Sequence, residues 1–237
     1  MDQKHHDDHT EIHLKSSDFL RDIVIGMSDG LTVPFALAAG LSGAVSSSNI
    51  IVIAGIAEIA AGSIAMGLGG YLAGKTEQDH YTSEVKREHY EVENLRHKEI
   101  EETKEFFANI GLSEAVQEQA TQEIAKDKDR WVDFMMKYEL GLDKPDPKRA
   151  TKSALNIGVS YIAGGIIPLS PYFFISPSTE ALKYSVIATL VCLFLFGYFK
   201  SKVTGVNAFW GAVRVTLIGA VAAAAAFGVA KLFDSGF

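Results

Sequence analysis

The stretch from Ile50 to Gly74 reads IIVIAGIAEIAAGSIAMGLGGYLAG and contains a single charged residue, Glu58. A helix needs about 20 mostly apolar residues to cross the roughly 30 Å of hydrocarbon in a bilayer. Backbone N–H and C=O groups find no partner in lipid, so a segment that crosses it must be helical. This stretch therefore predicts a membrane-spanning helix and places the chain among membrane proteins.

Four further stretches share this apolar character. Together with the first, they predict five spans, at residues 21–45, 50–74, 153–174, 181–199 and 205–232. Each has the length that a transmembrane helix requires. The sequence therefore predicts an all-α, polytopic membrane protein with five transmembrane helices, whose partner is the lipid bilayer and which has no nucleic-acid partner.

Charge is concentrated between the second and third spans. Residues 76–149 contain 19 of the 29 acidic residues and 12 of the 22 basic residues, so this segment alone accounts for the formal net charge of −7. It is rich in Glu, Lys and Arg, which favour helix. We expect a three-helix insert, with helices over residues 76–108, from Ser113 onward, and from Asp127 to about Leu140.

The domain organisation follows from these segments. We predict a polar N-terminal tail (1–20), transmembrane helices 1–2 (21–75), a helical metal-binding insert (76–149) and transmembrane helices 3–5 (150–237). Basic residues near span ends gather on one side of the membrane if the spans alternate, namely Arg21, Lys75, Lys148, Arg149, Lys152, Lys200 and Lys202. By the positive-inside rule, the N-terminus and the insert are cytosolic and the C-terminus lies on the far side.

Two features limit the other chemistry that the chain can contain. The single cysteine, Cys192, rules out an intramolecular disulfide and a thiolate metal site. The N-terminal tail holds four of the seven histidines and lacks the basic-then-apolar order of a signal peptide. Its His/Asp mixture is able to bind metal weakly, although a solvated tail is the favoured interpretation.

Two carboxylates, Asp29 and Glu58, lie inside the first two spans. A charge within a span costs at least about 2.5–3.5 kcal/mol, so such residues usually line a polar path. A protonated acid that only packs is the alternative. At about 1.5 Å per residue, Asp29 and Met66 each lie about 12 Å from the cytosolic end of their span, and Glu58 lies about two turns farther. We predict a transport path formed by Asp29, Glu58 and Met66.

The residues around this path suggest how it is built. Pro34 follows Asp29 by five residues and is expected to kink the first span, which frees carbonyl oxygens near the acid. Small residues such as Gly26, Gly30 and Gly62 allow helices to approach closely in lipid. Five spans make a thin bundle for enclosing a path, so a homodimer with the path at or near its interface is expected.

The insert carries a second set of candidate ligands. On a helix over 76–108, four glutamates project within an arc of about 80°, and Met135 and Glu139 share one face of the third helix. A Glu-rich run is usually only a solvated face, but uncompensated carboxylates repel one another and a bound cation would relieve that repulsion. We therefore predict a metal site formed by Glu88, Glu91, Glu99, Glu102, Met135 and Glu139, with His80, His89 and His97 as further possible ligands.

The types of ligand narrow the choice of ion. Clustered carboxylates suit hard divalent cations, whereas methionine beside them argues against Mg²⁺ and Ca²⁺. The mixed set points to Fe²⁺, with Mn²⁺, Co²⁺ and Zn²⁺ as possible ions at the cytosolic insert. No Walker A motif is present in the sequence, so ATP is not an obvious source of energy.

Two segments resemble the vacuolar iron transporter family, and in particular its plant members. Residues 21–35 read RDIVIGMSDGLTVPF and resemble the first span of that family, while residues 58–67 read EIAAGSIAMG and resemble the second. The charged insert and the total of five spans also match. The resemblance implies a dimeric Fe²⁺/H⁺ antiporter that moves iron from cytosol to vacuole, with the membrane-path and insert residues named above in those roles.

Two other functions remain open on the residues alone. The paired glutamates are similar to those of di-iron carboxylate proteins, which leaves a membrane-anchored ferroxidase open, although ferritin-like sites use two Glu-x-x-His patterns and the chain contains one, Glu77 to His80. A membrane-anchored metal sensor is the other alternative, and it leaves Asp29 and Glu58 unexplained. We therefore expect a transporter and not an enzyme, with proton exchange through acids whose protonation competes with metal.

Overall fold

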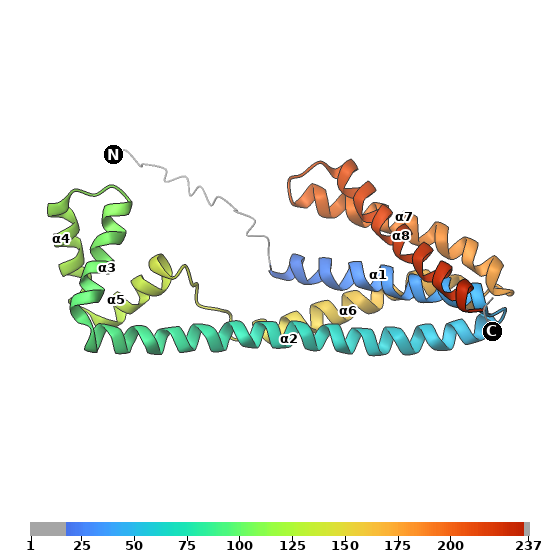
Figure 1. Cartoon of the computed structure of the whole chain (residues 1–237), viewed down its shortest axis with the longest axis horizontal. Helices are drawn as coiled ribbons and strands as arrows, with labels where there is room; N and C mark the ends of the chain where they lie inside the picture. Colours follow the sequence, from blue (N-terminus) through green and yellow to red (C-terminus); the bar gives the residue numbers. More distant parts are fainter. Residues whose placement is uncertain (1–17, 235–237) are drawn as a thin grey trace, which may run out of the picture. The chain divides into compact units, whose positions relative to one another are not determined.

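The computed structural model describes residues 18–234, and every regular element in that range is a helix. The elements are α1 (Asp18–Ala44), α2 (Ser48–Asn94), α3 (Arg96–Asn109), α4 (Glu114–Ile124), α5 (Lys128–Phe134), a π-helical turn (Met135–Glu139), α6 (Arg149–Leu169), a 3₁₀ turn (Ser170–Phe173), α7 (Ser178–Val203) and α8 (Ala208–Asp234). Figure 1 shows them in chain order. The predicted all-α class is confirmed.

Five of these helices are long and apolar enough to cross a membrane: α1, α2, α6 with its 3₁₀ turn, α7 and α8. The five predicted spans are therefore confirmed, with ends close to those expected except that α2 continues from the predicted end at residue 74 to Asn94. The chain forms two compact units, a membrane unit (Met1–Gly70 with Lys152–Phe237) and an insert unit (Tyr71–Thr151). Most of the predicted polar tail, residues 1–17, lies outside the described residues.

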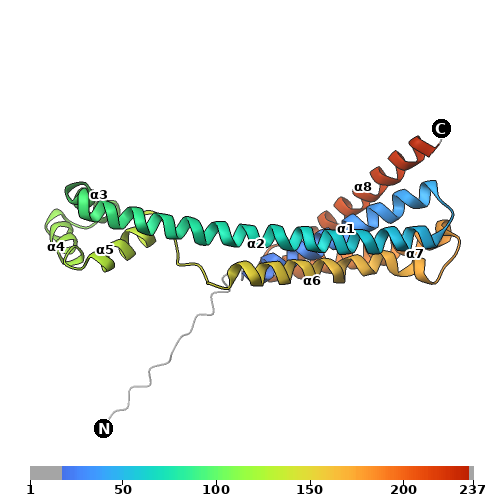
Figure 2. The same cartoon turned by 90° about the horizontal axis from the view of Figure 1, so that it is seen from below.

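Within the membrane unit, α6 packs against both α1 and α2, and it lies alongside α2 in both views (Figures 1 and 2). Glycines make this packing close. A Cβ atom on Gly30 of α1 would lie 2.3 Å from the backbone oxygen of Tyr161, and one on Gly67 of α2 would lie 3.0 Å from that of Ala154. Small residues of this kind let helices associate in lipid, where no hydrophobic force drives them together.

Polar bonds tie the helix ends together at the α1–α2 turn. The hydroxyls of Ser42 and Tyr172 lie 2.8 Å apart, and the Ser178 hydroxyl donates to the Val45 carbonyl at 2.6 Å. The Ser48 hydroxyl donates to the Ile175 carbonyl at 2.9 Å. These bonds satisfy carbonyl groups that have no partner within a helix, which lipid could not do.

The insert unit has an apolar core of its own. Its fully buried members are Val92, Ala125, Trp131, Val132, Met135 and Met136. The prediction of one uninterrupted helix over 76–108 is wrong, because α2 ends at Asn94 and α3 leaves it at a sharp angle from Arg96 (Figure 1). No Gly or Pro marks this break. Burial of Val92 and Ile100 in a shared core overrides the helical propensity of the segment.

The third predicted helix begins where expected and changes from α-helical to π-helical geometry at Met135. The carboxylate of Asp127 accepts a hydrogen bond from the Arg130 backbone N–H at 3.1 Å and caps α5. From Met135 the turn widens, and the Leu140 N–H donates to the Met135 carbonyl at 3.0 Å, five residues back. Such π-helical turns occur frequently at functional sites.

Candidate functional site

Three carboxylates meet where α2 gives way to α3. Glu88 and Glu91 lie in the last turns of α2, Glu99 lies in the first turn of α3, and the carboxylate oxygens of all three lie within 4.8 Å of one another. Glu88 and Glu99 are buried and Glu91 is half-buried. The predicted grouping is therefore present, but two helices that meet at Leu95 form it, rather than one stripe on a single helix.

Glu99 has the least compensated charge of the three carboxylates. The side chain is fully buried, and neither carboxylate oxygen has a hydrogen-bond partner. Burial and then repulsion from Glu102, Glu88 and Glu91 raise the pKa of Glu99 from 4.5 to about 7. A buried charge without a partner is costly, and a divalent cation among these oxygens would supply the missing partner.

Two flexible cations lie at the edge of the cluster. Arg87 lies 2.5 Å from Glu84, 3.4 Å from Glu88 and 3.8 Å from Glu91, and half of its side chain is exposed. The ammonium of Lys98 lies 2.8 Å from Glu102. About half of each side chain is exposed to solvent. The two cations offset part of the negative charge, and an incoming metal ion would take over that role.

The remaining predicted ligands of the insert are placed less uniformly. Burial first, and then repulsion from Glu102 and Glu88, raises the pKa of Glu139, so these three carboxyl groups share one electrostatic field. Met135 instead lies in the apolar core, with its sulfur 3.4 Å from the Thr103 hydroxyl. The structure thus groups Glu88, Glu91 and Glu99, places Glu102 and Glu139 within electrostatic range of them, and holds the Met135 thioether beside Thr103.

Thr103 was not predicted from the sequence, yet it organises this region. Its hydroxyl donates to the Glu99 carbonyl at 2.7 Å and accepts from the indole N–H of Trp131 at 2.8 Å. A hydroxyl has one proton, so the Met135 sulfur contacts the oxygen without receiving that proton. A threonine in a charged helix carries no signal of such a role in sequence.

The raised pKa of Glu99 gives a testable dependence on pH. Between pH 4.5 and about 7 the folded insert binds more protons than the unfolded chain, so its stability falls as pH rises through this window. We expect the contribution of Glu99 to the urea resistance of the metal-free protein to be largest below pH 4.5 and to be lost above about pH 7. The measurement is the fluorescence of Trp131 in a Trp210→Phe background with chelator present. Glu99→Gln should flatten the pH dependence, whereas the exposed Glu101→Gln should preserve it, and equal slopes would show that Glu99 is not the group responsible.

Within the membrane unit, Glu58 has a specific partner that the sequence did not indicate. The hydroxyl of Tyr161 on α6 donates to Glu58 Oε1, while Oε2 is buried and has no hydrogen-bond partner. Glu58 also lines a groove of about 680 Å³ whose other residues come from α1 and α8. One oxygen is therefore held by Tyr161, and the other is buried without a hydrogen-bond partner.

The α6 contacts also fix the levels of Asp29 and Met66. Gly30 on α1 abuts Tyr161, Ser63 on α2 lies opposite Gly158, and Gly67 lies opposite Ala154. When each residue is assigned to the nearest level along the axis of α6, Asp29 lies at a level between those of Glu58 and Met66. The glycine contacts place Met66 near residue 155 and Asp29 near residue 160 of α6, so their levels differ by about five residues, or roughly 7–8 Å, and not by zero as predicted. The transport path through these three residues stays a prediction.

Pro34 behaves only partly as predicted. Helix α1 continues through it to Ala44. Because proline has no N–H, the carbonyl of Gly30, four residues earlier, loses its helical donor. Two residues before the Gly30 carbonyl, the Ser28 carbonyl has a side-chain partner, because the Thr32 hydroxyl donates to it at 2.8 Å. The Gly30 carbonyl, next to Asp29, therefore lacks its usual helical donor, and the kink at Pro34 stays a prediction.

A further buried carboxylate was missed. Asp22 is 1% exposed and accepts hydrogen bonds from Ser153 at 3.0 Å and from Asn156 at 3.3 Å, both on α6. Its position next to Arg21, at the expected end of the span, made it look like a surface residue. The only available signal was its spacing of seven residues from Asp29, which places both acids on one face of α1.

The histidines of the insert lie away from the three-carboxylate group. His80 is 3.7 Å from Glu84, His97 is 3.4 Å from Glu101, and His89 is 3.9 Å from Asp129. The four histidines of the tail lie outside the described residues. The described residues therefore assign the candidate insert site to carboxylates.

The sequence model of the VIT family matches residues 20–231. The chain belongs to the VIT family. This VIT-family chain is 50% identical over 228 residues to vacuolar iron transporter 1 of Tulipa gesneriana, across 96% of its own length and 92% of that relative. It is 51% identical over 226 residues to vacuolar iron transporter 1 of Arabidopsis thaliana, across 95% and 90%.

The similarity extends beyond plants. Protein CCC1 of Saccharomyces cerevisiae is 40% identical over 222 residues, which cover 90% of this chain and 68% of the yeast protein. The predicted resemblance to the vacuolar iron transporters is confirmed by these matches. The plant relatives carry the names of transporters, which supports the prediction that this VIT-family protein is not an enzyme.

Proposed function

We propose that this protein moves Fe²⁺ from the cytosol into the vacuole, across the vacuolar membrane, in exchange for protons. The observation that carries the proposal is the pair of carboxylates, Asp29 and Glu58, within two helices that are long enough to span a membrane. The names of the plant relatives supply the ion and the compartment. Acids buried in spans mark ion and proton pathways because they are otherwise costly.

In this proposal the path consists of Asp29, Met66 and Glu58. Met66 and Asp29, nearer the cytosolic end of the bundle, capture the ion with a thioether and a carboxylate. Glu58 lies farther along and releases it, with the oxygen that Tyr161 leaves free facing the ion. A soft and a hard ligand in series suit a borderline cation such as Fe²⁺.

Proton exchange follows from the same acids. A carboxylate must be ionised to hold metal well, and it is less costly in lipid when neutral. Each acid therefore alternates between metal and proton. Tyr161 favours this exchange at Glu58, because a hydroxyl is able to donate to the ionised form and to accept from the protonated one.

The insert serves as a cytosolic metal-binding domain in this proposal. Glu88, Glu91 and Glu99 form its centre, with Glu102, Glu139 and Met135 as further ligands. Four or more carboxylates concentrate divalent cations near the membrane, and Mn²⁺, Co²⁺ and Zn²⁺ would also bind there.

A homodimer is part of the proposal. Within one chain, the groove that contains Glu58 has walls formed by α1 and α8. A second copy packed over this groove would enclose Glu58 and exclude lipid from the path. Closed two-fold dimers are the commonest oligomers, and one interface of this kind completes both copies at once.

The test is Fe²⁺ uptake into sealed liposomes that contain the purified protein and a pH-sensitive dye. Uptake should be faster when the interior is acidic, and it should make the interior more alkaline. A ferroxidase or a sensor would consume or bind Fe²⁺ without accumulating it inside. Uptake that ignores the pH gradient would refute the proton exchange, and absence of any uptake would refute the transporter.

Orientation gives a separate prediction, made in a Cys192→Ser background. Tyr90→Cys in the insert and Val206→Cys between α7 and α8 should react with a membrane-impermeant maleimide on intact vacuoles. Phe174→Cys, which is 88% exposed between α6 and α7, should react only after the vacuoles are permeabilised. Labelling of Phe174→Cys on intact vacuoles would mean that the orientation is inverted or that a span has been miscounted.

A further inference from the structure

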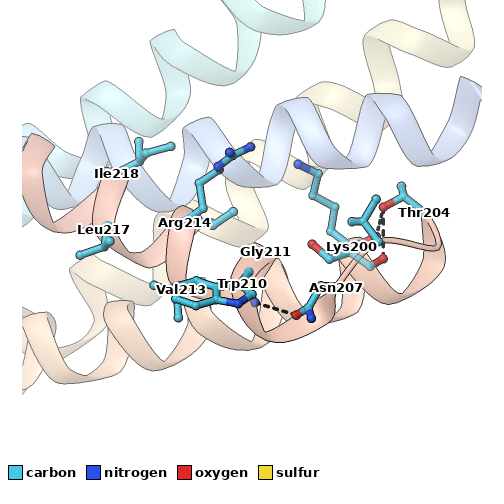
Figure 3. A pocket seen from close by; sticks show the side chains of 12 residues that line it. Lys200, Thr204, Asn207, Trp210, Gly211, Val213, Arg214, Leu217 and Ile218 are labelled. Carbon is cyan, nitrogen blue, oxygen red and sulfur yellow. Dashed lines mark hydrogen bonds between the residues drawn. The ribbon is translucent and has the colours of Figure 1, made fainter.

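A second pocket in the membrane unit is not lined by Asp29, Glu58 or Met66. It has a volume of about 720 Å³ and is lined by the end of α7, the turn after it, and the first turns of α8 (Figure 3). None of its lining residues is acidic. The proposed transport path does not use this pocket, so its composition needs a separate explanation.

The walls of the pocket are fixed by the turn between α7 and α8. The carboxamide oxygen of Asn207 accepts from the Trp210 N–H at 3.1 Å and caps α8, and the Thr204 hydroxyl donates to the Lys200 carbonyl at 3.1 Å. A Cβ atom on Gly211 would lie 1.8 Å from the Ser201 hydroxyl, so glycine lets the helices touch here. These two side-chain hydrogen bonds and the close contact of the helices at Gly211 fix the shape of the pocket.

Two cations face this pocket. Lys200 on α7 and Arg214 on α8 project to the same side in Figure 3. Among the residues that the structure describes, neither side chain forms a hydrogen bond or an ion pair with another. Both helices are candidate membrane spans, and Arg214 lies six residues into α8, about 9 Å along its axis.

An arginine at this depth without a protein partner requires an explanation. Unpaired charge near the hydrocarbon is costly, and cations in spans normally pair or reach the headgroup layer. The uncharged part of the lining divides into two kinds. Asn207 and Thr204 provide polar atoms at the turn, whereas Leu217 and Ile218, each 59% exposed, extend an apolar surface along α8.

We propose that this pocket binds the headgroup of an anionic phospholipid, with its phosphate between Lys200 and Arg214. The guanidinium and ammonium groups supply the charge that a phosphate requires. The carboxamide of Asn207 donates to headgroup oxygens, and the acyl chains lie along Leu217 and Ile218. Basic pockets between transmembrane helices are typical sites for such headgroups. A lipid would contact both the charged residues and the apolar residues of the lining, while a free phosphate would contact only the charged ones.

The experiment uses the full chain in neutral detergent and native mass spectrometry, with dioleoyl phosphatidylinositol 4-phosphate and dioleoyl phosphatidylcholine as probes. The wild type should bind the anionic lipid at least about tenfold more tightly than the neutral one. Lys200→Gln with Arg214→Gln should weaken binding of the anionic lipid by about thirtyfold, as two cations at a membrane surface imply. Arg214→Lys should retain most of the binding, which shows that the charge and not the fold is responsible.

The matched control removes two other cations, Lys202 and Lys148, neither of which lines the pocket. Lys202→Gln with Lys148→Gln should bind the anionic lipid as the wild type does. An equal loss in this control would overturn the proposal, because general surface charge would then explain binding. Soluble inositol 1,4-bisphosphate should bind far more weakly than the lipid. If it bound as tightly, the acyl chains would contribute nothing and the lipid would be the wrong occupant.

Discussion

Asp29→Asn is expected to reduce Fe²⁺ flux by at least about a hundredfold. The reason is that the bound ion would lose its pairing with the Asp29 carboxylate, and removing one partner of a buried charge pair costs several kcal/mol. The amide retains the size of the carboxylate and part of its hydrogen bonding. It loses the charge that compensates for dehydration of the ion, and it cannot exchange a proton. Folding should be nearly unchanged, since Asp29 forms no ion pair among the residues that the structure describes.

The measurement is uptake into liposomes at matched protein density, with elution volume as the check on folding. Asp18→Asn is the control, because Asp18 lies on the same helix with a side chain that is 58% exposed. Met66→Leu then separates ligation from packing, since it conserves volume and removes only the sulfur. Wild-type flux and proton countermovement in Asp29→Asn would remove Asp29 from the path.

The second large effect is expected in the insert. Replacing Glu88, Glu91, Glu99 and Glu102 by Ala should lower the affinity of the full chain for a divalent ion by roughly a hundredfold or more, since even outer-sphere partners of a metal site contribute tenfold to a hundredfold. The variant also removes the repulsion around Glu99, so the metal-free insert should become no less stable. Calorimetric titration with Mn²⁺ avoids the oxidation of Fe²⁺. Flux should fall but persist, because the membrane path is intact.

A control with the same change in charge is available in the insert. Glu77, Glu101, Glu105 and Glu114 are all exposed, and their joint replacement by Ala alters the net charge equally. This variant should keep the wild-type affinity. Equal losses in the two quadruple variants would show that a diffuse negative field, rather than the three-carboxylate group, attracts the ions.

The membrane helices were predictable because lipid imposes a simple rule on the chain. Apolar length alone located all five, and the ends of spans such as Ser178–Val203 differ from expectation by only a few residues. Asp29 and Glu58 were recognisable for the same reason, since a charge in an apolar run is conspicuous. Their relative level was not predictable, because it depends on how α6 packs between α1 and α2.

In the insert, the break between α2 and α3 could not be predicted from the sequence. Periodicity on an assumed straight helix grouped Glu88, Glu91 and Glu99 correctly but for the wrong reason, because the chain turns at Leu95 without a Gly or Pro to announce it. Tyr161 and Thr103 were missed since each acts across a tertiary contact. Asp22 was missed because burial at a span end cannot be distinguished from exposure without its partners, Ser153 and Asn156.

The glycine contacts along α6 limit how this protein is able to move. With Cβ positions on Gly26 and Gly30 only 2.3 Å from carbonyl oxygens of α6, α1 cannot slide along α6 without the two backbones first separating. Shear between packed helices is therefore unavailable here, and α1, α6 and the membrane half of α2 should move as one rigid body. The Gly40–Ala226 contact between α1 and α8 is looser, at 3.3 Å, so we expect any alternation of access to come from displacement at the α1–α8 groove, whose α8 wall consists mostly of alanine.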